Sequence, residues 1–256
     1  MPVAPKRLPF FEHLAELRRR IVIIAVAVTV ASSVLYIWAW EMLGFLLKPV
    51  LPYIGGGIVD GQLVLPGPFD PFTFRFKVAL YAALVITSPV IIWQILAFFL
   101  PALKPKEQRY FIPTFFAAVV LFLAGNVFCY QVILGTAIEW MVGQVGGPVT
   151  ILPDAAKYLS GVTLLMLGFG LAFEIPIVIF YLVAFNIVPY RKMRKNWRTA
   201  YVILMVVASI ATPDWSPVTM GLLFVALLGL YEVSLGLARL LLVKRIAAQR
   251  AAEDEV

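Results

Sequence analysis

Long apolar runs, separated by short polar or Pro/Gly-rich stretches, make up most of the chain. A helix that crosses the ~30 Å hydrocarbon core of a bilayer needs about 20 predominantly apolar residues. Such runs predict six membrane-spanning helices, at approximately 21–40, 76–100, 111–138, 158–185, 199–212 and 218–242. No connector is large enough for a soluble domain. We therefore expect an all-α integral membrane protein with one membrane domain over residues 1–256.

The last two apolar runs are shorter than the others. Residues 199–212 would span only roughly 21 Å at ~1.5 Å per residue. The sixth run, from Val218, meets Glu232 after about 14 residues. We expect these short fifth and sixth spans to thin the bilayer locally or to be covered by other protein.

Composition supports a membrane protein and excludes several other classes. Hydrophobic residues make up 62% and charged residues 14%, against about 45–50% and about 25% in soluble domains. One cysteine and one histidine exclude an internal disulfide and a zinc site of the usual kind. The nucleotide-binding motif G-x-x-x-x-G-K-[ST] and the serine motif G-x-S-x-G are absent. We expect neither an enzyme nor a cofactor.

The distribution of basic residues predicts the orientation in the membrane. All but four of the 21 Lys and Arg residues lie in segment 1–20, in the second and fourth connectors, or in the C-terminal region that begins with Arg239 at the end of the last span. The exceptions are Lys48, Arg75, Lys77 and Lys157. Because Lys and Arg accumulate on the cytoplasmic side, both termini are predicted to be cytoplasmic, with 243–256 as a cytoplasmic tail.

The N-terminal stretch "PFFEHLAELRRRI" (9–21) has its apolar residues on one face of a helix. It predicts an interfacial helix that lies against the cytoplasmic surface, before the first span. On this helix Glu16 is spaced to pair with Arg20. From periodicity alone, this local pair is the favoured interpretation of Glu16.

The scarcity of cytoplasmic acids supports a second interpretation of the same carboxylate. Outside the tail acids 253–255, only Glu12, Glu16 and Glu107 are expected on that side. A cationic ligand would be repelled by the basic surface unless placed carboxylates received it. Glu107 could instead complement a helix N-terminus.

Glu174 lies within the apolar run "GFGLAFEIPIVIF" (168–180). An acid within the membrane costs ~2.5–3.5 kcal/mol on insertion scales and normally faces a cavity or a partner. Pro176 predicts a kink beside it. The alternative is a buried, hydrogen-bonded carboxyl that only joins helices.

For Glu232 a structural pair with Arg239 is as plausible as a functional role, and Asp214 is expected to make a turn hydrogen bond.

Four motifs together resemble the TatC family, the multi-span subunit of the twin-arginine protein translocase. They are "HLAELRRRI" (13–21), "SPVIIWQILAFFLPALKPKEQR" (88–109), "FGLAFEIP" (169–176), and "TPD" (212–214) ahead of the "YE" at 231–232. The resemblance implies six spans in a glove-like bundle with a concave face. It places the protein in the bacterial cytoplasmic membrane and implies protein export driven by the proton gradient.

The same resemblance implies roles for individual residues. Glu16 and Glu107 would receive the paired arginines of a signal peptide, with Arg18 and Phe98 on the same surface. Glu174 would line the concave face and contact the single-span TatA and TatB partners of an oligomeric complex. The segment "TPDWSPVTM" (212–220) departs from the family's TPPD pattern, so only Asp214 is carried over there.

A proton- or ion-coupled secondary transporter is the main alternative, with Glu174 as its coupling site. Such transporters often contain internal repeats and broken helices, and no repeat is evident in this sequence. The sequence also lacks the Ser/His or paired-Asp set that an intramembrane protease needs, because its one histidine, His13, is predicted to be cytoplasmic.

Overall fold

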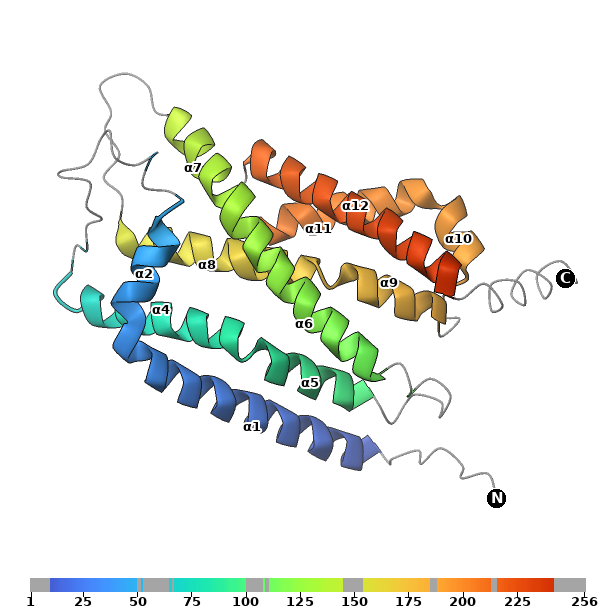
Figure 1. Ribbon diagram of the computed structural model, residues 1–256, viewed down its shortest axis with the longest axis horizontal. Coiled ribbons are helices and arrows are strands. Elements are labelled where there is room, and N and C mark those ends of the chain that lie inside the picture. The colour runs from blue at the N-terminus through green and yellow to red at the C-terminus, as the bar shows by residue number, and fades with distance from the viewer. Residues whose placement is uncertain are drawn as a thin grey trace, which may run out of the picture.

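The computed structural model describes residues 10–49, 52, 65, 67–99, 108, 111–144, 154–184, 188–212 and 216–241, and these are almost entirely helical. The helices are α1 (Phe10–Leu35), η1 (Tyr36–Trp38), α2 (Ala39–Leu47), α4 (Asp70–Ile86), α5 (Ser88–Phe99), α6 (Phe111–Phe128), the π-helical η5 (Cys129–Ile133), α7 (Leu134–Gly143), α8 (Ala155–Ala172), α9 (Ile175–Ala184), α10 (Tyr190–Lys195), α11 (Trp197–Ala211) and α12 (Pro217–Leu241). In Figure 1, α1 begins and α12 ends at the same end of the bundle. The predicted all-α class is confirmed.

Apolar helices occur in each of the six regions predicted to span the membrane. Four are long enough by themselves: Phe11–Leu47, Phe111–Gly143, Ala155–Val183 and Pro217–Leu240. The bent pair of α4 and α5 supplies a fifth candidate, and the shorter apolar helix α11 a sixth. At 15 residues, α11 is about 22 Å long, so it is short as expected. The sixth helix is not short, because α12 continues through Glu232 for 25 residues.

The prediction of a separate interfacial helix before the first span was wrong. Helix α1 runs without a break from Phe10 to Leu35. This stretch contains neither Pro nor Gly, so nothing in it interrupts the backbone hydrogen bonds of a helix. Along its length α1 packs against α4 and α5, and the three lie side by side in Figure 1.

Two proline-associated breaks interrupt the helices of the bundle. Helices α4 and α5 meet at 55°, where Thr87 precedes Ser88 and Pro89. The Thr87 hydroxyl donates back to the Ala83 carbonyl at 2.7 Å. Helices α8 and α9 are separated by a break just before Pro176, at the position of the predicted kink, but together they still form one candidate span, Ala155–Val183.

Helix α8 begins with a capping carboxylate at the end of the bundle opposite the α1 N-terminus. Asp154 accepts hydrogen bonds from the backbone N–H of Ala156 at 2.8 Å and of Lys157 at 3.2 Å. The hydrogen bond from the Lys157 amide lowers the pKa of the Asp154 carboxyl. This cap satisfies amide groups that have no partner within the helix.

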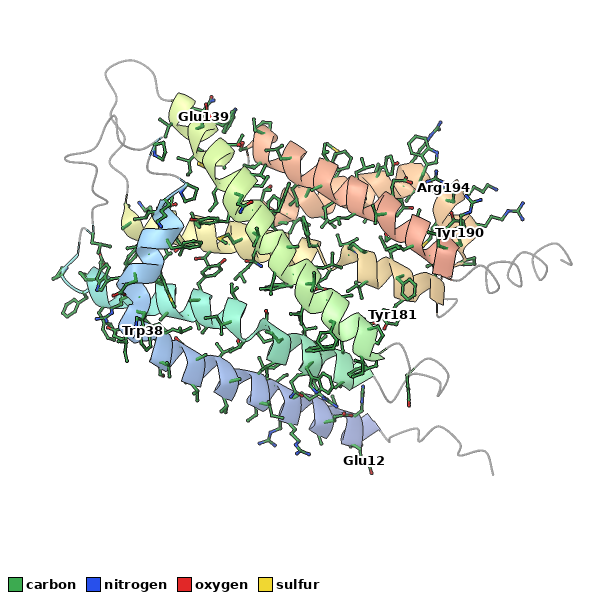
Figure 2. All side chains as sticks on the ribbon, in the orientation of Figure 1. Glu12, Trp38, Glu139, Tyr181, Tyr190 and Arg194 are labelled. Carbon is green, nitrogen blue, oxygen red and sulfur yellow. The ribbon has the colours of Figure 1, made fainter. Side chains whose placement is uncertain are left out.

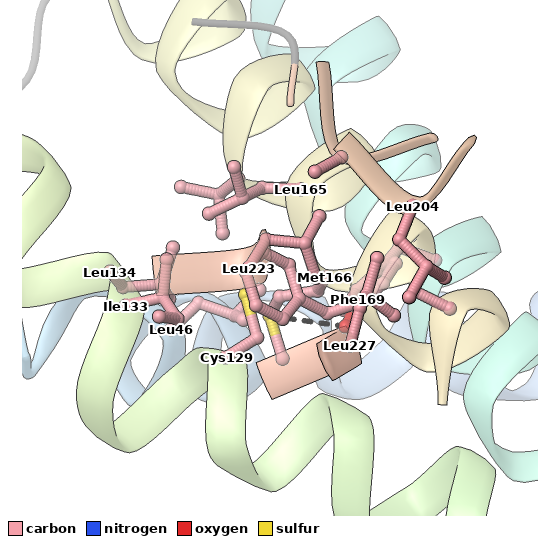
Figure 3. Close-up of a cluster of buried hydrophobic side chains, with 14 of the residues drawn as sticks. Leu46, Cys129, Ile133, Leu134, Leu165, Met166, Phe169, Leu204, Leu223 and Leu227 are labelled. Atoms are coloured by element: carbon pink, nitrogen blue, oxygen red, sulfur yellow. Dashed lines mark hydrogen bonds between the residues drawn. The ribbon is translucent and has the colours of Figure 1, made fainter. Parts of the chain in front are cut away.

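The buried core draws side chains from α2, α4, η5 and each of α7 to α12, and Figure 3 shows part of it. Gly125 lets α6 approach α8 closely, since a Cβ there would lie 2.7 Å from the Phe169 carbonyl oxygen. Beside this contact, the buried Tyr81 hydroxyl donates to Asn126 Oδ1 at 3.1 Å. Small residues and interhelical hydrogen bonds are the usual means of joining helices within lipid.

Candidate functional site

Glu16 and Arg20 form the predicted pair one turn apart on α1. Arg20 Nε donates to Glu16 Oε1 at 3.1 Å. The same guanidinium reaches across to α5, where Nη1 donates to Gln94 Oε1 at 3.1 Å and Nη2 to the Ala97 carbonyl oxygen at 3.0 Å. Ala97 lies in the last turn of α5, whose carbonyl groups have no partner within the helix. The pair therefore does more than stabilise α1, because it joins α1 to α5.

The second oxygen of the Glu16 carboxylate has a different environment. Oε2 is buried and accepts no hydrogen bond from the described residues. It lies 3.8 Å from His13 Nδ1, and the His13 ring stacks on Phe98 of α5 with centroids 4.2 Å apart. A buried carboxylate oxygen without a donor is unfavourable. The cluster thus contains one acceptor that a further donor would stabilise.

The predicted recognition residues are only partly brought together. Glu16 and Phe98 lie in one cluster, connected through His13. Arg18 is exposed and lies two residues from Glu16, which places it on the opposite face of α1. Glu107 lies outside the described residues, and so does Asp214.

Sequence reasoning missed two members of this cluster, His13 and Gln94. Both occur within the quoted motifs, but the site residues were predicted mainly from Lys, Arg, Asp and Glu positions, which include neither of them. Only the packing of α1 on α5 shows that Gln94 faces Arg20. Glu12, the third acid predicted to be cytoplasmic, is exposed near the start of α1 (Figure 2).

Glu174 occupies the break between α8 and α9. Its backbone carbonyl accepts hydrogen bonds from the amides of Ile177 and Val178 at the start of α9. Its side chain is partly buried, and Oε1 has no hydrogen-bond partner among the described residues. Within the described part of the chain, the Glu174 carboxyl therefore forms no hydrogen bond that joins two helices.

Glu232 is paired, but its partner is not Arg239, which the sequence offered as one of two alternatives. Arg194 Nη1 donates to Glu232 Oε2 at 2.6 Å, and the Tyr201 hydroxyl donates to Oε1 at 2.9 Å. The hydrogen bond with Glu232 raises the pKa of the Arg194 guanidinium. The expected partner lies seven residues along α12, roughly 10 Å away along the axis, whereas α10 brings Arg194 directly to the carboxylate.

Comparisons with known proteins agree with this fold over most of the chain. The family described as "Sec-independent protein translocase protein (TatC)" matches residues 12–225. The protein of that name from Koribacter versatilis is 32% identical, over 98% of this chain and 92% of its own. The Synechocystis protein is 37% identical over 90% and 88% respectively. A crystal structure of the twin-arginine translocase receptor TatC superposes with a TM-score of 0.73 at 30% identity, and covers 88% of this chain and 99% of its own.

The fold and these matches define a multi-span membrane component of a protein translocase. The chain belongs to the TatC family. The resemblance found in the four sequence motifs is thereby confirmed, and the translocase reading is favoured over the secondary transporter.

Proposed function

We propose that this chain is the subunit of a twin-arginine translocase that recognises signal peptides. The observation that carries this proposal is the Glu16 carboxylate, which keeps a buried acceptor oxygen without a hydrogen-bond donor. Family membership supplies the context, since the matching solved structures are described as a twin-arginine translocase receptor. In this role the complex exports folded proteins across the cytoplasmic membrane and is driven by the proton gradient.

Recognition rests on carboxylates that receive the guanidinium groups of the paired arginines. Glu16 supplies one and Glu107 the second, while the aromatic ring of Phe98 lies beside the first. Charge-assisted hydrogen bonds between guanidinium and carboxylate are directional, and a lysine ammonium cannot reproduce their planar geometry. Arg18 lies on the opposite, exposed face of α1, so any part it takes in recognition is through its charge at this end of the helix and not through a contact beside Glu16.

The proposed location is the bacterial cytoplasmic membrane, with both termini on the cytoplasmic side. The shared end of α1 and α12 supports this topology, as does the predicted distribution of Lys and Arg. Thiol labelling tests it: in a Cys129→Ala background, Arg250→Cys should be protected from an impermeant reagent in intact cells, and Gln144→Cys should be labelled. The reverse pattern would refute the topology.

Partner subunits of the TatA and TatB type are proposed to bind within the membrane. Glu174 supports this proposal because its side chain is available at a helix break, without a partner in the described chain. A hydrogen bond between spans is worth about 0.6–2 kcal/mol. Such a contact is weak enough to form and dissociate during a transport cycle.

Export of a folded reporter tests the proposed function. In cells without their own TatC, this chain is expressed with TatA and TatB, and a fluorescent protein carries a signal peptide with paired arginines. We expect export that is lost when the arginines become lysines, and that falls strongly in Glu16→Gln. Equal export with paired lysines would contradict the proposal.

A further inference from the structure

Glu16 is already engaged by an arginine of its own chain, and this raises the question of how it could bind another. The Arg20 guanidinium holds three acceptors on two helices: Glu16 Oε1, Gln94 Oε1 and the Ala97 carbonyl oxygen. Its side chain is only 20% exposed. A ligand would have to break all of these contacts to evict Arg20. The resident pair is therefore expected to persist when a ligand binds.

We propose that Arg20 is a positioning residue, which fixes the Glu16 carboxylate so that Oε2 alone receives a signal-peptide guanidinium. This inference rests on the proposed function. Arg20 occupies Oε1 and, through Gln94 and Ala97, fixes the carboxylate against α5. Oε2 is left on the side of His13, whose imidazole is 44% exposed. The ligand approaches from that side and displaces the weak contact between His13 and Oε2.

This arrangement makes geometry more important than net charge at Glu16. Arg20 already neutralises the carboxylate, so the remaining attraction for a second cation comes chiefly from hydrogen bonds to one oriented oxygen. A planar guanidinium can donate to Oε2 and still lie against the stacked rings of His13 and Phe98, because guanidinium groups stack on aromatic faces. An ammonium group offers no such plane. Rotation of the carboxylate would therefore reduce the preference for arginine over lysine.

Gln94 offers the cleanest test, because it acts on Glu16 only through Arg20. The full chain is reconstituted in lipid nanodiscs, and dissociation constants are measured for a fluorescent signal peptide with paired arginines and for its paired-lysine version. Gln94→Leu removes one anchor of the guanidinium. Gln131→Leu makes the same change at an exposed position on η5 and serves as the control. Gln94→Glu keeps an acceptor oxygen in place and serves as the rescue variant.

We expect Gln94→Leu to weaken binding of the paired-arginine peptide by about tenfold, as for one misaligned charge-assisted hydrogen bond. Binding of the paired-lysine peptide should change little, Gln94→Glu should restore the preference, and Gln131→Leu should match the wild type. In a Glu16→Gln background, Gln94→Leu should have no further effect, because both changes remove the same contact. Arg20→Lys should lower the preference likewise, whereas Arg19→Lys, at an exposed neighbouring position, should not.

The possible failures are distinguishable. If Glu16→Gln weakens binding but Gln94→Leu does not, or if their effects add, the positioning role of Arg20 is refuted while the proposed function stands. Equal weakening of both peptides by Gln94→Leu would show a merely structural role and would also overturn the inference. If Glu16→Gln itself leaves paired-arginine binding unchanged, the proposed site fails, and the inference fails with it. Should Gln94→Leu not fold, Arg20→Lys against Arg19→Lys gives the same comparison.

Discussion

Arg194 on α10 and Glu232 on α12 are joined by a hydrogen bond of 2.6 Å. The contact ties the short basic helix to the last spanning helix, and the Tyr201 hydroxyl of α11 completes it at the other carboxylate oxygen. One side chain thus holds together three helices that are consecutive in the chain. Figure 2 shows the Arg194 side chain on α10, near the end of the bundle where α12 ends.

Because this pair is exposed, we expect the ion pair between Arg194 and Glu232 to contribute less to stability than the hydrogen bond from Tyr201 to Glu232. Both side chains are partly exposed, by 56% for Arg194 and 37% for Glu232, and exposed pairs contribute little. Arg194→Gln should shift the thermal unfolding midpoint in detergent by no more than about 2 °C. Glu232→Leu should shift it further, because Tyr201 also loses its acceptor. Lys192→Gln controls for the loss of charge, and equal effects of Arg194→Gln and Glu232→Leu would contradict this ranking.

The cap at Asp154 predicts a pH dependence of the first turn of α8. The lowered pKa of its carboxyl means that the carboxylate stabilises the folded state above the ordinary pKa, and that this contribution is lost as the pH falls through the lowered value. Hydrogen exchange at Ala156 and Lys157, corrected for its intrinsic pH dependence, should therefore accelerate in acid. In Asp154→Asn the amide oxygen still caps the helix but does not titrate. Its exchange should lack this acid transition, and a transition that persisted would exclude Asp154 as its origin.

Gly125 predicts a steric limit on the contact between α6 and α8. A Cβ at this position would lie 2.7 Å from Phe169 O and 2.9 Å from Phe173 Cγ. Gly125→Ala should therefore destabilise the protein by about 1–3 kcal/mol, as overpacking does. At Gly161, a Cβ would meet no atom within 4 Å, so Gly161→Ala is the matched control. Denaturant unfolding measures both, and similar stabilities would show that the helices can separate at little cost.

Substitution of Glu174 is expected to impair partner binding and to leave signal-peptide binding intact. Glu174→Ala removes the polar group at the break between α8 and α9, so recovery of TatA and TatB with the protein and export should both fall. Membrane insertion and peptide affinity should remain near the wild type. Glu139→Ala removes an exposed glutamate on α7 and is the control.

A second variant separates two roles for this carboxyl. Glu174→Gln retains hydrogen bonding but cannot ionise. Export by the Gln variant would indicate a hydrogen-bonding anchor, and failure would indicate that the charge or proton is needed. If Glu174→Ala instead abolishes peptide binding or folding, the residue is structural.

The shortness of α11 predicts an effect of helix length on transport. Four additional apolar residues would extend it by about 6 Å and would relieve local thinning of the bilayer. We expect the lengthened protein to insert normally but to export poorly. Full export would show that the short helix is incidental to transport.

The spans were predictable from the sequence, whereas several contacts were not. Apolar length alone locates a spanning helix, and Pro176 signals the helix break beside Glu174. Pro89 gave the same kind of signal for the bend between α4 and α5, because a proline disfavours the helical conformation of the residue that precedes it. The partner of Glu232 could not be found in this way, since Arg194 belongs to another helix and only tertiary packing brings it near.

The candidate site shows the same division. Glu16 and Phe98 were named from motifs, and the pair of Glu16 with Arg20 from helical spacing. The free second oxygen of Glu16 and the contact of Arg20 with Gln94 depend on how α1 packs against α5. Helical spacing relates residues within one helix only, so it gave no information about these contacts.

We propose that Glu16 and Glu107 together distinguish paired arginines from paired lysines. This proposal is tested most directly by the ratio of dissociation constants for the two signal peptides, measured on the wild type, Glu16→Gln, Glu107→Gln and the double variant. Each single change should weaken paired-arginine binding by about 1.5–3 kcal/mol, and added salt should weaken binding by the wild type. The ratio should approach one in the double variant. A double variant that kept the wild-type ratio would contradict the proposed role of these two carboxylates.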